Sequence, residues 1–265
     1  IDARRRRPIV NRLHAVWSVG AVLGGLAGAA LAAADASVTV HFLAAAAIVG
    51  ALNLTATDLV GAPEPLAAPI QPRFRWWQSR TLVALAAMGV AGSVLEGAPL
   101  DWGALYLADE LDAAPGVAAA ATVTFTTGMV LARLVGDHVV ERFGVPFVLR
   151  IGAAAAAIAL AAAIAFPNVA VVLVTWFVVG AGVATAYPGL FVAAGRAPHL
   201  PPGVGIGAVA SVARTGFLIG PALIGAIADR ASLRVALTVP AIAALCIVAL
   251  AGAARRPDPL SGGTP

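Results

Sequence analysis

Long apolar stretches alternate with short polar connectors along almost the whole chain. Each stretch has about 20 residues and almost no charge, which is the length that an α-helix needs to cross a hydrocarbon core of roughly 30 Å. A backbone in lipid must satisfy its own hydrogen bonds, so helices are the expected form. The pattern predicts an all-α, polytopic transmembrane helical bundle with about eight spans. The predicted spans are His14–Ala34, Val38–Leu59, Leu82–Leu107, Ala114–Val135, Pro146–Phe166, Val169–Ala194, Gly203–Ala228 and Val235–Ala253.

The composition agrees with a membrane protein. Hydrophobic residues make up 60% of the chain, charged residues 11%, and the mean hydropathy is +0.93. Soluble domains carry about 25% charged residues. A water-soluble globular domain is therefore excluded, and a lipid bilayer is the expected surroundings of the helices.

The distribution of arginine predicts the topology. All 17 basic residues are arginines, and the formal net charge is +4. Most of them fall on one side of the predicted spans, whereas the other side has Arg230 and Arg234 with the acidic cluster Asp109, Glu110 and Asp112. Basic residues favour the cytoplasmic side. We therefore expect a multi-pass protein of the cytoplasmic (inner) membrane with both chain ends in the cytoplasm. Topology explains the charge better than a nucleic-acid partner does.

One long polar interruption, Gly61–Arg80, divides the chain after the second predicted span. It contains four prolines and reads as an extended linker between domains. The chain also starts at Ile1 and runs directly into an arginine cluster without a signal peptide. We interpret it as a fragment, or as a chain whose upstream portion is not represented.

The segment Gly136–Gly144 (Gly-Asp-His-Val-Val-Glu-Arg-Phe-Gly) resembles the cytoplasmic loop motif of the major facilitator superfamily of secondary transporters. The resemblance implies a tight loop in which Gly136, Asp137, Arg142 and Gly144 control the closed conformation. The stretch Gly220–Gly225 resembles a helix pattern of the same family in which small residues allow close packing. Its packing residues would be Gly220, Pro221 and Gly225.

This resemblance also implies a domain organisation. The eight spans would be helices five to twelve of a twelve-helix transporter, without the first four. Residues 1–60 would be the last two helices of the N-terminal bundle. Residues 61–80 would be the cytoplasmic linker, and residues 81–265 the six-helix C-terminal bundle with a short tail.

The stretch Glu96–Leu107 is similar to a segment of the fucose-permease-like and YbjJ-like branch of the superfamily, through its Glu-Gly, Asp-Trp and Tyr-Leu pairs. Gly97 and Pro99 should interrupt the helix, because proline lacks the N–H that a helix needs. Glu96 lies past mid-depth of the span, so it is a candidate for contact with substrate or for proton coupling. A structural kink with Glu96 hydrogen-bonded to a neighbouring helix is the alternative. Asp101 and Trp102 are weaker candidates.

Two arginines and one tyrosine complete the candidate residues. Arg214 lies too deep to reach water easily, so it should face a cavity or a carboxylate, with Glu96 as the candidate partner. A purely structural salt bridge is the competing interpretation. Arg133 is expected near a cytoplasmic helix end, where it would pair with Asp137. Tyr187 precedes Pro188 at a predicted bend and is a candidate for lining the pathway.

These residues predict a secondary active transporter that moves a small solute by alternating access, with protons as one candidate coupling ion. No cofactor or metal is expected, because Cys246 is the one cysteine and metalloprotease or hydrolase motifs are absent from the sequence. We do not expect an enzyme. A polytopic membrane enzyme and a receptor or scaffold that transports nothing remain the alternatives.

Overall fold

The computed structural model describes residues 37–56, 75–197 and 203–255, together with the single positions 16, 19, 20, 23, 24 and 27. These residues fall into two compact units, one that contains α2 (Val38–Ala56) and one that runs from Arg75 onward. The first predicted span and most of the predicted linker lie outside the described residues. The second predicted span corresponds to α2, an apolar helix of 19 residues.

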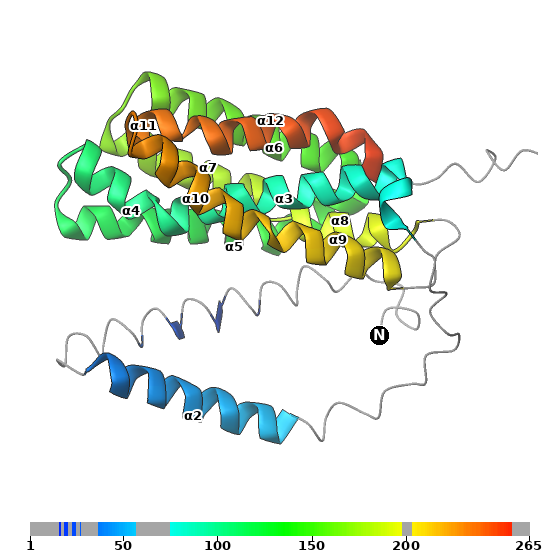
Figure 1. Cartoon of the computed structure of the whole chain (residues 1–265), viewed down its shortest axis with the longest axis horizontal. Helices are drawn as coiled ribbons and strands as arrows, with labels where there is room; N and C mark the ends of the chain where they lie inside the picture. The colour runs from blue at the N-terminus through cyan, green and yellow to red at the C-terminus, as the bar shows by residue number, and fades with distance from the viewer. Residues whose placement is uncertain are drawn as a thin grey trace, which may run out of the picture. The chain divides into compact units, whose positions relative to one another are not determined.

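The unit from Arg75 onward is built from helices, and its described residues contain no strand (Figure 1). Six helical spans within the described ranges are long and apolar enough to cross a membrane. They correspond to the last six predicted spans. The elements are η2 (Trp76–Gln78), α3 (Arg80–Asp101), α4 (Gly103–Leu105), the π-helical turn η3 (Tyr106–Glu110), α5 (Pro115–Phe143), α6 (Val145–Ala165), α7 (Val169–Val183), α8 (Ala186–Ala194), α9 (Val204–Arg214), α10 (Gly216–Ala228), α11 (Leu233–Ala236), α12 (Thr238–Leu250) and η4 (Ala251–Ala254).

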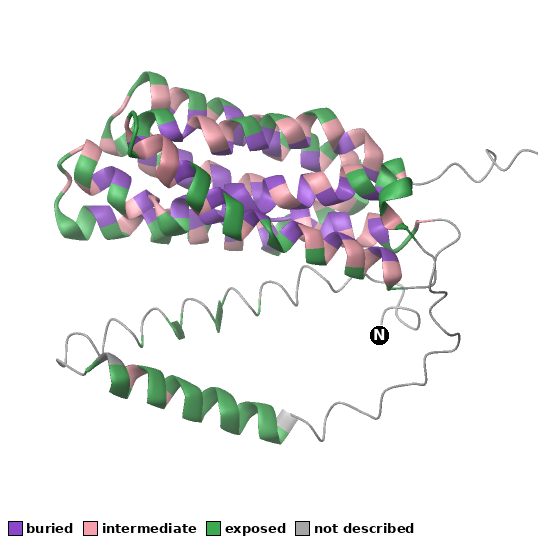
Figure 2. Ribbon diagram, in the orientation of Figure 1, coloured by how far each residue is buried: buried purple, intermediate pink, exposed green. Residues whose placement is uncertain are grey.

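Helix α3 forms the centre of this unit. It packs against α8, α9, α10 and α12, while α7 packs against α5 and α6. In the most apolar window of α3, 72% of the residues are buried, against 22% to 50% for the other five spans. Figure 2 shows the same concentration of buried residues along α3. A polar side chain in the buried part of α3, such as Ser93 or Glu96, therefore meets neighbouring helices rather than the surroundings.

The outer faces of the other helices carry large apolar side chains. Leu134, Ile158 and Leu218 are 68%, 71% and 77% exposed on α5, α6 and α10. A soluble protein would rarely expose so extensive an apolar surface. These faces are suited to contact with lipid tails.

Three of the six described spans are interrupted within their bounds, and each of them contains an interior proline, namely Pro188, Pro221 or Pro240. Helix α3 contains Pro99 and is not interrupted there. The uninterrupted helices α5 and α6 have proline only in their first turn, where no helical hydrogen bond is lost. An interior proline thus accompanies each interrupted span, but Pro99 in α3 shows that proline alone does not end a helix.

The predicted interruption at Gly97 and Pro99 is wrong in its position. Helix α3 continues through both residues, and its regular geometry ends at Trp102, which has φ −121°. The N–H of Trp102 still donates to the carbonyl of Ala98 over 3.0 Å. Pro99 removes only its own N–H, so the neighbouring hydrogen bonds can hold the helix together for another turn.

The predicted loop at Gly136–Gly144 is also wrong in its extent. Helix α5 continues to Phe143, so Gly136, Asp137 and Arg142 are helical and only Gly144, at φ 79°, leaves the helix. The polar residues of this segment mark the edge of the apolar stretch, but none of them stops a helix. Helix ends depend on residues such as glycine with positive φ, which here is Gly144.

Helices α5 and α7 cross in close contact at two glycines. A Cβ atom on Gly128 would overlap the carbonyl oxygen of Phe177, and one on Gly180 would overlap the carbonyl oxygen of Phe125. Only glycine allows two backbones to approach this closely. The crossing matters for function, because it fixes how α5 is placed beside the span formed by α7 and α8.

We predict that Gly128→Ala destabilises the folded protein by about 1–3 kcal/mol, because the added methyl group must push α5 and α7 apart. Gly207→Ala is the matched control, since a Cβ there has no atom within 4 Å. The apparent Tm of the detergent-purified protein measures both. An equal Tm for the two variants would contradict the described crossing.

Candidate functional site

Glu96 lies in the core of the six-span unit. It is 5% exposed on α3 and interacts electrostatically with Arg133 on α5. A buried carboxylate is costly unless a neighbouring group compensates its charge. The structure therefore gives Glu96 a basic neighbour, but not the one that the sequence suggested.

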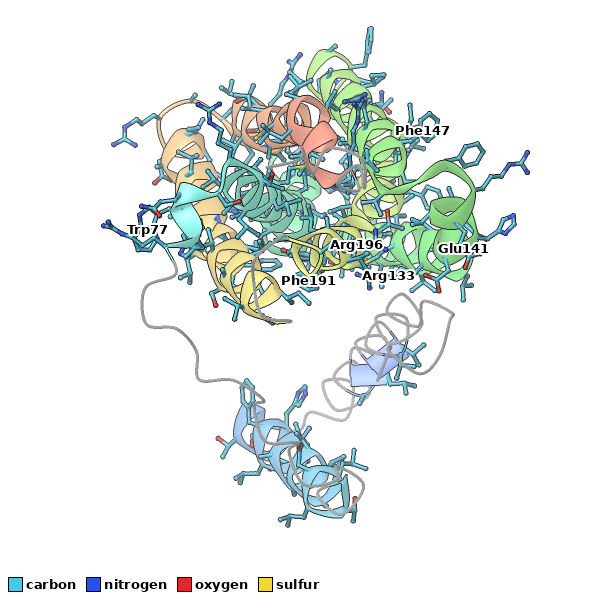
Figure 3. All side chains as sticks on the ribbon, turned by 90° about the vertical axis from the view of Figure 1, so that its right-hand side faces the viewer. Trp77, Arg133, Glu141, Phe147, Phe191 and Arg196 are labelled. Atoms are coloured by element: carbon cyan, nitrogen blue, oxygen red, sulfur yellow. The ribbon has the colours of Figure 1, made fainter. Side chains whose placement is uncertain are left out.

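Arg133 is itself buried, with 4% of its surface exposed. Its Nε donates a hydrogen bond of 3.3 Å to the backbone carbonyl of Ala184. The predicted position near a helix end was wrong, because α5 extends ten residues beyond Arg133 to Phe143. Figure 3, a view along the helices, places Arg133 on the same side of the unit as Phe191 and Arg196.

The carbonyl that Arg133 binds is available because of Pro188. In a regular helix, the carbonyl of Ala184 would accept from the N–H of residue 188, four positions on. Proline has no N–H. The span is interrupted here between α7 and α8, and the N–H of Gly189 resumes the pattern by donating to Thr185 over 3.0 Å. The helix is thus interrupted at Ala184 and Thr185, close to the bend that the sequence predicted at Pro188.

Ser93 connects α3 to two further helices. It is fully buried, and its Oγ lies 3.2 Å from the carbonyl oxygen of Gly89 and 2.6 Å from that of Ala213 on α9. It also forms a short hydrogen bond with the hydroxyl of Tyr187 on α8. Ser93 has one proton, and both carbonyls can only accept. Tyr187 must then donate to Ser93, which leaves the oxygen of Tyr187 as an acceptor toward its other neighbours.

Arg214 is exposed at the last position of α9. It interacts electrostatically with Tyr187, and within the described ranges no ion pair joins it to Glu96. The predicted pair of Glu96 with Arg214 is therefore not formed among the described residues; the basic group that acts electrostatically on Glu96 is Arg133. The rotation of α9 and of the start of α10 explains this, because Ala213 and Gly216 are the residues that lie against α3.

Asp101 and Trp102 lie apart from these residues. Asp101 is exposed at the end of α3, and the ring of Trp102 lies 3.2 Å from where a Cβ of Gly225 would be. The indole N–H of Trp102 has no hydrogen-bond partner among the described residues. A Cβ on Gly220 would lie 3.3 Å from Val94. Gly220 and Gly225 thus both lie against α3 and its continuation.

We call Ser93, Glu96, Arg133, Tyr187 and Arg214 the polar cluster. Its members come from four of the six described spans. The sequence analysis missed Ser93 and the core position of Arg133. One signal was present, since Ser93 precedes Glu96 by three residues and therefore lies near the same face of α3. Within the described ranges, no group of three His, Cys, Asp or Glu side chains could hold a metal ion.

Comparison with known proteins decides the family. Residues 81–265 match the Major Facilitator Superfamily. The chain belongs to this superfamily of membrane transporters. It is accordingly a multi-pass membrane protein, and its six described spans form part of a transmembrane bundle.

Relatives in bacteria agree with this membership. The chain is 30% identical to an uncharacterized transporter of Sinorhizobium fredii over 95% of the chain and 67% of that protein. It is 29% identical to an uncharacterized MFS-type transporter of Yersinia pestis over 97% of the chain and 66% of that protein. A shorter match, 32% identical over 53% of the chain and 34% of the relative, is to the membrane protein MosC of Rhizobium meliloti. The chain spans about two thirds of the length of the first two relatives.

We predict that Arg133→Gln destabilises the protein by about 3 kcal/mol or more, because it leaves a buried carboxylate uncompensated. Adding Glu96→Gln should recover part of this loss, so the double variant will be more stable than the sum of the two single effects. Thermal unfolding of all four proteins measures the coupling. Strictly additive effects would show that the two charges do not interact.

Proposed function

We propose that this chain is the larger part of a secondary active transporter that moves a small solute by alternating access, with the polar cluster at its centre. The observation that carries the proposal is the buried pair of Glu96 and Arg133, which lies beside an interrupted span in a superfamily of transporters. Charged groups at membrane depth are expensive and usually functional. Superfamily membership favours this reading over a membrane enzyme or a receptor.

The cluster offers a way to couple binding to movement. Arg133 holds the backbone of the interrupted span at Ala184 while its charge compensates Glu96 on α3. A proton or a substrate that changes the charge at Glu96 would change how strongly Arg133 is held between the two. The span formed by α7 and α8 can bend at this point, because Pro188 has no N–H to donate to the carbonyl of Ala184. Protons are the coupling ion that a carboxylate suits best.

The other candidate residues are assigned roles from their positions in the described helices. Tyr187 and Arg214 would contact the substrate from α8 and α9, with Asp101 and Trp102 nearer the other end of α3. At the end of α5, the segment from Gly136 to Gly144 would gate the cytoplasmic side. Three of its four motif residues, Gly136, Asp137 and Arg142, lie within helix α5. The segment would therefore move as a rigid end of α5 rather than as a flexible loop.

The whole transporter would have twelve helices in two bundles. In this arrangement residues 1–60 contribute the last two helices of the first bundle, residues 61–80 the linker, and residues 81–265 the second bundle. Four helices would precede those of this chain, which fits relatives that are about half as long again. We place both ends of the chain in the cytoplasm and the protein in the inner membrane, on the arginine distribution. The fucose-permease-like branch remains our preferred relationship within the superfamily.

We predict that Glu96→Gln reduces transport to a few per cent of the wild-type rate, because the carboxylate can no longer change charge. Uptake of labelled sugars, carboxylates and amines by the whole transporter in proteoliposomes, under an imposed proton gradient, measures this. Asp109→Asn is the matched control, since Asp109 is exposed in η3 and lies outside both the polar cluster and the Gly136–Gly144 segment. Full activity of Glu96→Gln would remove Glu96 from the mechanism.

A further inference from the structure

Arg214 is the charge in the polar cluster that the described residues leave uncompensated. Arg133 is the basic group that acts electrostatically on Glu96, and among the described residues no carboxylate forms an ion pair with Arg214. Its described electrostatic neighbour is Tyr187, which is neutral. A guanidinium group does not lose its charge in a protein. It therefore requires an anion, water or both.

Because Arg214 lies deep in its span, bulk water alone is not expected to stabilise its charge. It lies eleven residues into a 25-residue span, from Val204 to Ala228, and so close to the middle of the helix. At about 1.5 Å per residue, roughly 15 Å separates it from the start of the span and roughly 21 Å from its end, which is farther than an arginine side chain can reach. The exposed side of α9 at this point cannot face lipid tails without great cost. A water-filled passage through the proposed transporter would suit it.

The neighbours of Arg214 also hold its charge in place. Tyr187 donates its proton to Ser93, so its oxygen can accept from a nearby guanidinium. Ser93 is in turn held by the carbonyl of Ala213, the residue before Arg214. The backbone at Arg214 is thereby tied to α3 and α8, while the guanidinium remains exposed. This arrangement presents a fixed cation, with a neutral acceptor beside it.

We propose that Arg214 binds the anionic group of the transported substrate, which is a small organic anion such as a carboxylate or a sulfonate. The inference rests on the transport function proposed above and names its substrate class. Arginine suits this role, because its planar fork can form two parallel hydrogen bonds to a carboxylate. Arg214 places a positive charge on the exposed side of the cluster. That charge favours anions over amines and neutral sugars.

The first test compares substrates that share a skeleton and differ in charge. Uptake into proteoliposomes is measured for glucuronate, glucose and glucosamine, and for benzoate, benzyl alcohol and benzylamine. We expect uptake of a carboxylate, with a KM that rises about tenfold or more in Arg214→Gln and less in Arg214→Lys, while kcat changes little. Arg230→Gln is the control, since Arg230 is exposed and donates to the carbonyl of Ala226.

Uptake of a sugar or an amine with an unchanged KM in Arg214→Gln would overturn the substrate class and leave the transport function standing. Failure to take up any of the six solutes would count against the transport function as tested. The second test then decides the inference about Arg214, because it needs no transport.

The second test measures the charge at Arg214 with thiol reagents. Cys246→Ala removes the one cysteine of the chain, and Thr215→Cys adds an exposed thiol beside Arg214. The rates of reaction with an anionic methanethiosulfonate (sulfonatoethyl) and a cationic one (trimethylammonioethyl) are compared. Arg214→Gln should lower the anion-to-cation rate ratio by about fivefold or more. Benzoate should slow the reaction when Arg214 is present.

An unchanged ratio in Arg214→Gln would overturn the proposal, because it would mean that an acidic group elsewhere in the protein already neutralises the arginine. No reaction at Thr215→Cys would overturn it too, since this side of α9 would then lie outside the aqueous passage.

Discussion

The buried carboxylate of Glu96 is the constraint on which the arrangement of this bundle depends. It lies in the most buried helix, α3, where water cannot compensate its charge. Arg133 supplies the opposite charge from α5 and binds the carbonyl of Ala184, which Pro188 leaves without its helical donor. The guanidinium of Arg133 on α5 thus acts on α3 through its charge and on the span of α7 and α8 through its hydrogen bond to the carbonyl of Ala184. Because Glu96 gains or loses its charge with a proton, the same link can respond to its surroundings.

Most of the fold could be predicted from the pattern of the sequence, because length and hydropathy decide which segments span a bilayer. The ends of the helices could not. The polar residues from Gly136 to Phe143 mark the edge of the apolar stretch, yet the helix continues through them. Prolines likewise indicated an interrupted span but not the point of interruption. Pro99 stands three residues before the irregular Trp102, whereas Pro188 follows the break that it causes.

The candidate site was predictable in part, for a related reason. Glu96 stood out because an acid in an apolar helix is rare. Its partner was not predictable, because pairing depends on how each helix is rotated about its own axis. Spans rich in alanine, valine and glycine have no distinct polar face, so their sequence does not indicate how each helix is rotated. Close packing fixes the rotation instead: Ala213 and Gly216 turn α9 and the start of α10 toward α3, and Arg214 consequently turns away.

The choice between Arg133 and Arg214 as the neighbour of Glu96 can be measured directly by cross-linking. In a Cys246→Ala background, cysteines replace Glu96 and one of the two arginines, and a short bifunctional thiol reagent is added to the membrane-embedded protein. The account predicts efficient cross-linking of the pair at 96 and 133 and little at 96 and 214. Preferential cross-linking of 96 with 214 would contradict it.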